Sequence, residues 1–305
     1  MGDLLQSQEP QPQPPLLFLL GELSGETKHG LVDPIDNTFN SIDFPELESQ
    51  SECLSSNFGW LLILSRETSS LFFFNPITRH RIDLPFWNHL FAVAAFSAPP
   101  TSPDCSVFAV EMPKYSCRLR IDTLNVGQKA WTRHGYFNNI KTTFTGVVEA
   151  AYSKGCLYCV DMRGRVGIFD GKHGSWKVVP CKGFQKVQVP YLVEFNGEIY
   201  AAKKGAYGEV EKLERLIMDD NRAVWKEVKD LGDVDVYLGP YGSCFLPLHG
   251  ENMEKKFFIA NLRPKSMYPI STVDLDDCIC KKSSISVPES YGCYYTPVWI
   301  QRQNP

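Results

Sequence analysis

The sequence lacks the features that mark membrane proteins and nucleic-acid-binding proteins. No stretch approaches the roughly 20 consecutive apolar residues that a transmembrane helix requires. Basic residues do not predominate either: 31 Lys and Arg stand against 35 Asp and Glu, and the formal net charge is -4. Without a broad positive field, a protein has no general attraction to nucleic acid or to anionic lipid surfaces. We therefore expect no nucleic acid and no membrane among its main partners.

Signals for secretion are also missing. No Asn-x-Ser/Thr glycosylation acceptor occurs, and the apolar run at residues 16–20 follows acidic residues and prolines rather than the basic residues of a signal peptide. The ten cysteines are interpreted as reduced thiols, because a chain of 305 residues can bury a core large enough to fold without disulfides. These absences predict a cytoplasmic or nuclear protein.

Recognisable catalytic motifs are absent. The chain has no Gly-rich phosphate loop, no Gly-x-Ser-x-Gly nucleophile elbow and no His-Glu-x-x-His zinc motif. A glycosidase needs two facing carboxylates, but the acidic candidates are explained first as turn or strand-end residues: Asp161, Asp170, Asp219 and Asp274. The six histidines are scattered, and three fall in expected hairpin loops, where we interpret them as solvated: His29, His80 and His173. We predict no catalytic residues, no cofactor and no enzymatic activity.

Two cysteine pairs have spacings that a metal site can use. Cys156 and Cys159 form a Cys-x-x-Cys pair, but residues three apart on the strand predicted there point to opposite faces. Cys278 and Cys280 share a strand face, yet a structural zinc ion takes four ligands and no nearby histidine completes the set. We interpret both pairs as core or chance pairs and predict no bound metal.

What the sequence does contain is an all-β pattern. Residues 1–15 are rich in Gln and Pro and are predicted to form a disordered tail. From residue 16 onward, short apolar and aromatic runs alternate with Gly, Asn, Asp and Pro clusters, and helical periodicity is nearly absent. This pattern predicts a single all-β domain over residues 16–300, followed by a C-terminal tail at residues 301–305.

An internal repeat refines this prediction. The segment LLFLLGELSGETKHGLVDPIDNTFNSIDFP (16–45) aligns with WLLILSRETSSLFFFNPITRHRIDLP (60–85), and each contains a strand ending in Asp-Pro-Ile or Asn-Pro-Ile. Three later units place Trp six residues after an Asn or Asp: Asn125 with Trp131, Asp170 with Trp176, and Asp219 with Trp225. Asn and Asp close tight turns through their side chains, and Trp packs a broad ring between sheets. The spacing predicts one hairpin used three times.

The period of the repeat indicates the architecture. With a sixth unit at Asn261, turn residues recur at positions 33, 75, 125, 170, 219 and 261. A period of about 40 to 50 residues with several short strands is typical of propeller blades, because one small sheet is covered only when neighbours pack on both its faces. The sequence therefore predicts a single β-propeller, most naturally with six blades of about 46 residues. The last unit has one strand too many, and the final strand is expected to pair with the first unit and close the ring.

The segments CLSSNFGWLLIL (53–64) and LFFFNPITRHRIDLP (71–85) resemble the plant F-box-associated KIB-type β-propellers, a family also known as a domain of unknown function. The resemblance covers about residues 16–300 and extends to related F-box-associated propellers with kelch-like repeats. It implies a propeller that holds a substrate protein, while a preceding helical F-box docks on a cullin–RING ubiquitin ligase. Only residues 1–15 precede the first predicted strand here, so we expect no direct binding of a Skp-type adaptor.

The tryptophans fall into two groups. Four have repeat-equivalent or strand-internal places and are assigned to packing between blades: Trp60, Trp131, Trp176 and Trp225. Trp87, in the loop sequence PFWNHL, and Trp299, near the C-terminus, have no such place. Trp87 either lies buried under its loop or, beside Phe86 and His89, anchors a partner, as exposed aromatic residues often do. The candidate partner-binding residues are Arg79, His80 and Trp87.

Two functions remain open at this point. The first is a non-enzymatic propeller that binds a protein partner or substrate and is linked to ubiquitin-ligase pathways. The alternative is a propeller hydrolase or lectin that acts on carbohydrate. They differ in what must converge at the mouth of the central channel: carboxylates and aromatic rings for a sugar, and a broad mixed surface for a protein.

Overall fold

The fold is described for most of the chain. The computed structural model describes residues 13–21, 29–36, 38–48, 50–87, 93–111, 118–137, 144, 146–161, 164–182, 191–204, 210–219, 222–247, 257–260, 269–274, 279–284 and 295–302. All regular secondary structure in these ranges is strand, with no helix. Accordingly, no helix there is long and apolar enough to cross a membrane. The all-β prediction is confirmed.

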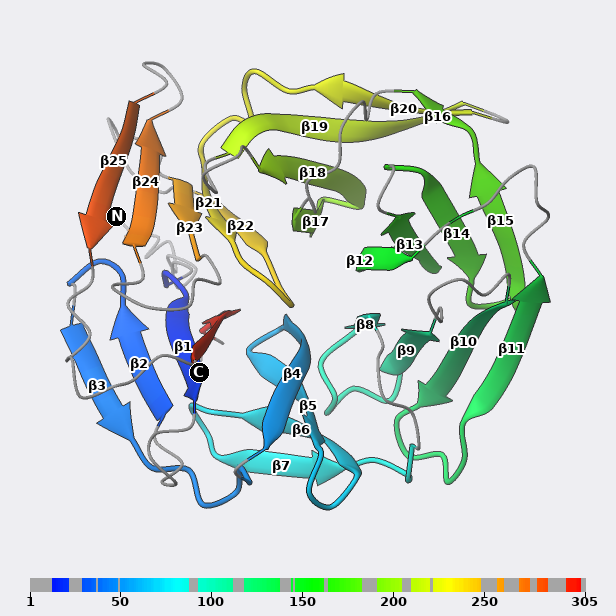
Figure 1. Ribbon diagram of the computed structural model, residues 1–305, viewed down its shortest axis with the longest axis horizontal. Helices are drawn as coiled ribbons and strands as arrows, with labels where there is room; N and C mark the ends of the chain where they lie inside the picture. Colours follow the sequence, from blue (N-terminus) through cyan, green and yellow to red (C-terminus); the bar gives the residue numbers. More distant parts are fainter. Residues whose placement is uncertain are drawn as a thin grey trace, which may run out of the picture.

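Six sheets stand as blades around a central axis, which Figure 1 views end on. From the axis outwards, blade 1 contains β26 (Tyr295–Ile300), β1 (Leu16–Gly21), β2 (His29–Asp33) and β3 (Thr38–Ile42). Blade 2 contains β4 (Ser51–Asn57), β5 (Trp60–Ser65), β6 (Ser70–Asn75) and β7 (His80–Asp83). Blade 3 contains β8 (Val93–Phe96), β9 (Ser106–Glu111), β10 (Arg118–Asn125) and β11 (Thr132–Phe137).

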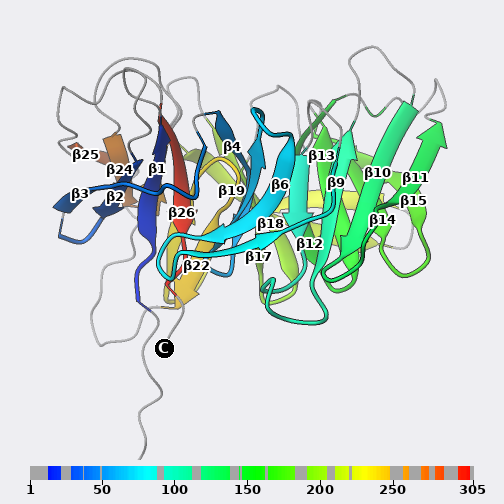
Figure 2. The same cartoon turned by 90° about the horizontal axis from the view of Figure 1, so that it is seen from below.

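The second half of the ring follows the same order. Blade 4 contains β12 (Val147–Ser153), β13 (Cys156–Asp161), β14 (Val166–Asp170) and β15 (Ser175–Val179). Blade 5 contains β17 (Tyr191–Phe195), β18 (Glu198–Lys204), β19 (Val210–Asp219), β20 (Arg222–Glu227) and β16 (Cys181–Lys182). Blade 6 contains β22 (Cys244–Pro247), β21 (Val234–Leu238), β23 (Phe257–Ile259), β24 (Pro269–Asp274) and β25 (Ile279–Ser284). Seen from the side, the blades form a flat disc (Figure 2), and the predicted six-bladed propeller is confirmed.

The last strand of the chain closes the ring. β26 pairs antiparallel with β1 along its whole length, so it serves as the inner strand of the first blade, as expected. The residues after it also contact the propeller: Gln301 accepts the Phe58 backbone N–H at 2.8 Å, and Arg302 forms an ion pair with Asp33. The first two residues of the segment predicted as a C-terminal tail therefore lie against blades 1 and 2. Of the predicted N-terminal tail, only residues 13–15 belong to the described part.

Two blades depart from the four-strand plan. In blade 5 the short strand β16 pairs parallel with β20 at the outer edge of the sheet. In blade 6, β21 runs parallel to β23, and β22 folds back inside β21, next to the axis. The inner strand of blade 6 is thus supplied by the β21–β22 hairpin, which the repeat does not predict. Asn261, the turn residue predicted for this unit, lies outside the described residues.

The other predicted turn residues end the third strand of blades 1 to 5. In three blades their side-chain oxygens accept backbone N–H groups further on: Asp33 from Ile35 at 2.9 Å, Asn75 from Ile77 and Thr78 at 2.9 and 3.0 Å, and Asp170 from Lys172 and His173 at 2.8 and 3.0 Å. The links to the fourth strand differ in length, however: four residues in blades 1, 2 and 4, six in blade 3 and two in blade 5. The prediction of one identical hairpin used three times is therefore wrong in detail.

The constant spacing reflects packing across the outer hairpin instead. In four blades the residue six positions after the turn residue lies over or opposite the residue three positions before it. The pairs are Phe39 with Gly30, Arg81 with Phe72, Trp176 with Gly167, and Trp225 with Leu216. In blades 1 and 4 only glycine fits beneath the ring, because an added Cβ atom would overlap it. Phe39 and Arg81 therefore take the place that Trp holds in blades 4 and 5, whereas Trp131 of blade 3 lies beside Trp87 and donates to the Pro85 carbonyl instead.

This packing gives a first testable expectation. Replacing Gly167 by Ala should lower the free energy of unfolding by about 1–3 kcal/mol, because the new methyl group displaces the Trp176 ring. Urea unfolding measures the difference. Gly135→Ala is the matched control: this β11 glycine has no heavy atom within 4 Å of an added Cβ, so its substitution should cost less than about 0.5 kcal/mol. In a Trp176→Ala background the Gly167→Ala cost should disappear, and a cost that persists would show that the ring is not the obstacle.

The core lies between the blades rather than inside any one sheet. One apolar cluster joins Trp60 of blade 2 to Phe96 of blade 3, and another joins Val160 of blade 4 to Trp225 of blade 5. A single blade leaves both faces of its sheet uncovered, so in a propeller the neighbouring blades must bury them. The assignment of the repeat-related tryptophans to packing between blades agrees with these clusters.

His29 departs from its predicted place. It is the first residue of β2 rather than a solvated loop residue, and it is 1% exposed. Its ring lies between those of Phe18 and Phe44, at centroid distances of 5.6 and 5.9 Å, and neither nitrogen has a hydrogen-bond partner among the described residues. Burial lowers the pKa of His29 from 6.5 to about 4, against a smaller opposing effect of Asp43. His80 and His173, in contrast, are exposed as expected.

Candidate binding surfaces

Arg79 and His80 lie on the surface where the turn after β6 enters β7. Arg79 has a φ of 56°, the left-handed conformation that reverses the chain. Its guanidinium donates to the Asp43 carbonyl at 3.2 Å and lies 5.1 Å from the centroid of the Phe44 ring, while the His80 ring lies 5.5 Å from that of Trp60. Both side chains are therefore accessible, although each also touches a neighbouring aromatic ring.

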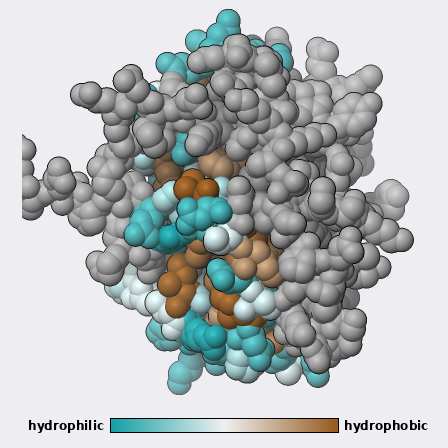
Figure 3. All heavy atoms as spheres, turned by 90° about the vertical axis from the view of Figure 1, so that its left-hand side faces the viewer, coloured by the Kyte–Doolittle hydropathy of each residue, from teal (hydrophilic) through white to brown (hydrophobic). Residues whose placement is uncertain are grey.

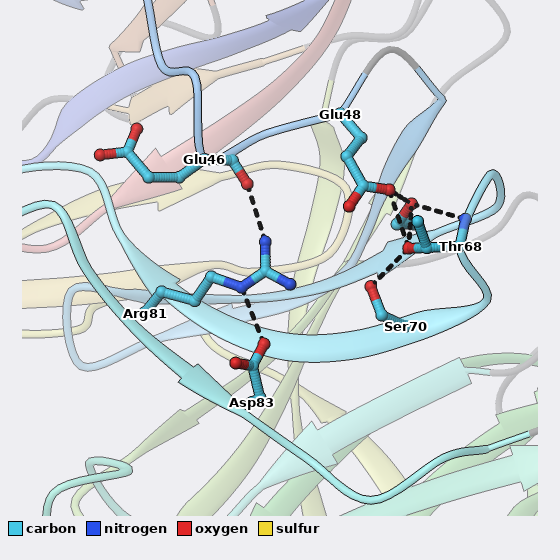
Figure 4. Close-up of polar contacts among 7 residues, drawn as sticks. Glu46, Glu48, Thr68, Ser70, Arg81 and Asp83 are labelled. Carbon is cyan, nitrogen blue, oxygen red and sulfur yellow. Dashed lines mark hydrogen bonds and ion pairs between the residues drawn. The ribbon is translucent and has the colours of Figure 1, made fainter.

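The next side chain, Arg81, fastens this edge of blade 2. It donates to the Asp83 carboxylate at 2.8 Å and to the Glu46 carbonyl at 3.0 Å (Figure 4). In the same view, Glu48 accepts the Thr68 hydroxyl at 2.8 Å. These bonds tie the connection from blade 1 to both outer hairpins of blade 2. These hydrogen bonds hold the turn before β7 in a fixed position on blade 2.

Trp87 is not available to a partner. It is 3% exposed, its indole N–H donates to Asp122 at 3.0 Å, and its ring lies 6.1 Å from that of Trp131. Of the two alternatives that the sequence left open, the structure shows burial, because the ring fills the space between blades 2 and 3. Trp87 is therefore removed from the candidate partner-binding residues. Its neighbour Phe86 is 67% exposed, and His89 lies outside the described residues.

A groove of about 500 Å³ separates blades 2 and 3 at their outer strands. Pro85 and Phe86 form one wall, and Lys129, Trp131 and Arg133 form the other. The Trp131 indole N–H donates to the Pro85 carbonyl at 3.0 Å, which fixes the two walls relative to each other. The groove is therefore a preformed aromatic surface rather than a gap between loose loops.

Basic side chains set the charge of this groove. Lys129 is exposed, and the Arg133 side chain is 61% exposed while its Nε lies 3.2 Å from Asp122. Asp122 is almost fully buried and also lies 3.4 Å from Arg120. Its carboxylate therefore contacts Arg133 from inside the protein and adds no negative charge to the surface of the groove. Among the described residues that line the groove none is acidic. The charged side chains that line the groove are therefore basic.

The turn and the groove are joined by β7, and together we call them the blade 2–3 rim. Its residues are Ile77, Arg79, His80, Phe86, Lys129 and Arg133. Sequence reasoning named two of them, and its third candidate, Trp87, is the buried neighbour of the exposed Phe86. Neighbouring residues of an extended segment point to opposite sides, so one of the pair Phe86 and Trp87 had to face inward.

The side of the ring that carries blade 1 has a different character. In Figure 3, hydrophobic side chains of the described residues lie in small groups separated by hydrophilic ones. Ile35, in the blade 1 turn, is one of the exposed apolar residues of the chain. This side therefore presents a mixed surface.

A second concave site lies at one mouth of the central channel. The cavity has a volume of about 250 Å³ and is lined by residues from the inner strands of blades 2 to 6, from the turns beside them, and by Gln301, which follows β26. Six aromatic residues contribute to the lining: Phe58, Phe96, Tyr152, Phe195, Tyr241 and Phe245. Two carboxylates, Glu149 of β12 and Glu194 of β17, also line it, whereas no Lys, Arg or His does so within the described part of the chain. The site is therefore aromatic and negatively charged.

Two-residue hairpins position much of this lining. They are Phe58-Gly59, Lys154-Gly155 and Asn196-Gly197, which link the inner strand to the second strand of blades 2, 4 and 5. Both residues of each have positive φ, as the favoured two-residue hairpin turns require. Sequence reasoning missed this site. A residue followed by Gly between two apolar runs is a signal for a two-residue hairpin, and these three pairs could have located the turns that line the site.

Burial dominates the electrostatics of the channel mouth. It raises the pKa of Tyr241 to about 12, with smaller contributions from Cys53 and from the negative charges of Glu52 and Glu149. Burial also raises the pKa of Tyr191, and Glu149 adds to that effect. Glu149 therefore acts on the tyrosines around it as a negative charge.

The cysteine pairs show no metal-binding arrangement in the part that can be described. Cys156 and Cys159 lie on β13 and face different apolar clusters, so their predicted placement on opposite faces is confirmed. Burial raises the pKa of both thiols. No group of three or more His, Cys, Asp or Glu able to hold a metal occurs among the described residues. Cys278 lies outside them, and so does the Cys280 side chain.

Comparison with known proteins gives consistent matches. The model of the KIB1-4 beta-propeller family matches residues 31–251. Among curated proteins of Arabidopsis thaliana, F-box protein At1g49360 is 28% identical over 228 residues, which cover 72% of this chain and 46% of that protein. F-box/kelch-repeat protein At3g18720 is 28% identical over 229 residues, covering 70% and 60%, and F-box protein At4g00893 is 32% identical over 163 residues, covering 53% and 41%. The chain thus spans about half the length of the curated relatives it matches.

Proposed function

This chain belongs to the KIB1-4 β-propeller family, and from that premise we propose that it is a non-enzymatic module that binds a protein partner through the blade 2–3 rim. Several relatives are named F-box or F-box/kelch-repeat proteins. By analogy with them, the bound partner is a substrate that the propeller presents to ubiquitin-ligase machinery in the cytoplasm or nucleus. The proposed role needs rigid recognition and no catalytic group.

The observation that carries this proposal is the composition of the rim. Two large apolar side chains, Ile77 and Phe86, are 48% and 67% exposed. Exposed apolar residues ringed by polar ones are typical of interaction sites. Most of the charged side chains beside Ile77 and Phe86 are basic, while Asp43 and Asp83 are exposed between them, and the backbone is held by the hydrogen bonds of Arg81 and Trp131. The rim therefore favours a partner segment that combines acidic and apolar residues.

The link to the ligase is proposed to run through another subunit. A Skp-type adaptor clasps a helical F-box, and the described residues of this chain contain strands and no helix. Size-exclusion chromatography of the purified chain mixed with such an adaptor should show two separate peaks. A stable complex of the two proteins would contradict this part of the proposal.

A charge reversal at the rim tests partner binding. We expect the double substitution Arg79→Glu with His80→Ala to reduce capture of partner proteins from plant lysate by about tenfold, because it removes two side chains that face the partner and repels an acidic segment. Loss of the Arg79 contact with Phe44 should cost no more than about 1 kcal/mol of stability. Quantitative mass spectrometry of the captured proteins and thermal melting measure the two effects.

The matched control is Arg222→Glu. This arginine is exposed after the corresponding turn of blade 5, far from the rim in the ring (Figure 1), and its reversal should leave capture unchanged. Equal capture by the rim variant and the wild type would remove the rim from the proposal. So would a rim variant that no longer folds, since both side chains would then be structural.

A further inference from the structure

A third concave site is a groove of about 500 Å³ between blades 3 and 4. Phe108 of β9 and Tyr152 of β12 contribute aromatic rings to its lining, and these rings stack at a centroid distance of 5.2 Å. The turn after β14 is fastened to blade 3, because the Tyr136 hydroxyl of β11 donates to the Gly174 carbonyl at 2.5 Å. The two blades are thereby held together here, and the groove has a fixed shape.

On the blade 3 side, two exposed amide side chains present hydrogen-bond donors to the groove. The Oδ1 atom of Asn125 accepts the Ser106 hydroxyl at 2.7 Å. The Oε1 atom of Gln128 accepts the Asn125 backbone N–H at 3.3 Å. Because each amide oxygen is already engaged within the protein, the NH₂ group of each side chain, with its two donors, is the part that is available to a ligand.

On the blade 4 side, the turn after β14 adds a positive charge. Lys172 in this turn and Thr132 on β11 are both exposed and line the groove. Asp170 begins the turn but does not belong to the lining: its carboxylate accepts the backbone N–H groups of Lys172 and His173 at 2.8 and 3.0 Å and lies 2.8 Å from the His173 ring. Among the described residues that line this groove there is no carboxylate. The lining therefore offers several donors, one of which is charged.

We propose that this groove binds the phosphate group of a phosphorylated serine or threonine in a protein partner. Such a group carries a charge of about −1.5 to −2 at neutral pH and three strong acceptor oxygens. Its oxygens accept hydrogen bonds from the NH₂ groups of Asn125 and Gln128 and from the Thr132 hydroxyl, while Lys172 supplies the counter-charge. Hydrogen bonds to an ionised acceptor are about twice as strong as those between neutral groups.

Other ligands fit the same observations less well. An aspartate or glutamate side chain has two oxygens and a single negative charge, so it meets fewer of these donors. A neutral sugar brings hydroxyl donors as well as acceptors, whereas the oxygens of Asn125 and Gln128 are already engaged. The net charge of -4 disfavours a nucleic acid as the source of the phosphate.

The choice of a protein as the carrier of the phosphate rests on the proposed function. The turn between β10 and β11 carries Gln128 into this groove and Lys129 to the blade 2–3 rim, so one partner can contact both. None of the residues that define the rim lines the groove between blades 3 and 4. Binding of a phosphate group in the groove and capture of a partner through the rim can therefore succeed or fail independently.

The test uses two peptides that differ only in the phosphate group. Calorimetric titration of the full chain with acetyl-Gly-Gly-phosphoserine-Gly-Gly-amide should show saturable binding, and the same peptide with serine should bind at least about tenfold more weakly. Asn125→Asp and Gln128→Glu keep the oxygen that accepts the internal hydrogen bond and replace the NH₂ group by a second oxygen. Each should weaken binding of the phosphoserine peptide by about tenfold, because a donor is lost and a negative charge faces the phosphate. Lys172→Gln, at an exposed position, should weaken it to a similar extent.

The matched control is Asn40→Asp, which adds the same charge at an exposed residue of the outer strand β3, on the opposite side of the ring (Figure 1), and should leave the affinity unchanged. Thermal melting confirms that each variant is folded. Three results would overturn the proposal: no binding of the phosphoserine peptide, equal binding of the serine peptide, or wild-type affinity in the three groove variants. Inorganic phosphate or a single-stranded oligonucleotide that binds as tightly as the phosphoserine peptide would likewise assign the groove to another source of phosphate.

Discussion

Replacing Trp299 by Ala is expected to lower the free energy of unfolding by about 3–5 kcal/mol, the range for large buried aromatic residues. Trp299 lies in the closing strand β26 and is 2% exposed. Its ring meets that of Tyr237 at a centroid distance of 5.2 Å, and its indole N–H donates to the Leu238 carbonyl at 2.9 Å. Its own carbonyl accepts the Ser56 hydroxyl at 2.7 Å. One residue therefore joins blades 1, 2 and 6.

Two further variants separate packing from hydrogen bonding at this position. Trp299→Phe keeps a ring and loses the N–H donor, so it should cost less than Ala, by about the 1–3 kcal/mol of an unsatisfied buried carbonyl plus a small cavity. Trp131→Ala, at a half-buried ring that bonds to Pro85, should cost less than Trp299→Ala. Urea unfolding of the three variants gives the order. If Trp131→Ala lowers the free energy of unfolding most, then the contacts of Trp299 in the closing strand β26 stabilise the ring less than those of Trp131 between blades 2 and 3.

Trp299 also shows where a repeat stops being informative. The turn residues and the aromatic residues six positions later recur in several blades, so the sequence predicts the propeller, its six blades and the pairing of the last strand with the first. The closing junction occurs once in the ring and has no counterpart to align with. Trp299 therefore carried no signal about its place, although the strand that bears it was predicted.

His29 is the opposite case, in which the repeat contained the answer. It lies four residues before the turn residue Asp33, and the corresponding residues of blades 2, 3 and 4 are Leu71, Ile121 and Val166. These three are apolar and buried within their strands. Aligning position by position rather than by turn alone places His29 inside a strand. Its identity as a histidine, not its position, suggested a solvated loop.

The binding surfaces depend on information that no single segment contains. Phe86, Lys129 and Arg133 are distant in sequence and meet because β7 of blade 2 ends beside β11 of blade 3. The channel mouth collects residues from blades 2 to 6 and Gln301 after β26, and its two carboxylates come from strands about 45 residues apart, one blade of the repeat. Only the turn carrying Arg79 and His80 is local, and that turn is the part that the sequence placed correctly on the surface.

The buried His29 should make the protein sensitive to mild acid. Its pKa is about 4 in the folded protein and about 6.5 in the unfolded chain, so between these values the unfolded chain binds more protons. Stability is therefore fully present above about pH 6.5, falls as the pH drops towards 4, and loses about 3 kcal/mol over that window. Carboxylates titrate in the lower part of the same window, so a variant is needed to isolate the histidine.

His29→Leu isolates it, because leucine has a similar volume, fits between the rings of Phe18 and Phe44, and does not titrate. Urea unfolding at pH 7.5, 6, 5 and 4 should show a loss of stability that is about 3 kcal/mol smaller in the variant than in the wild type. His80→Gln, which removes an exposed histidine of β7, should keep the wild-type slope. If His29→Leu loses stability as steeply as the wild type, protonation of His29 does not oppose folding, and the histidine must have a partner that satisfies its charged form.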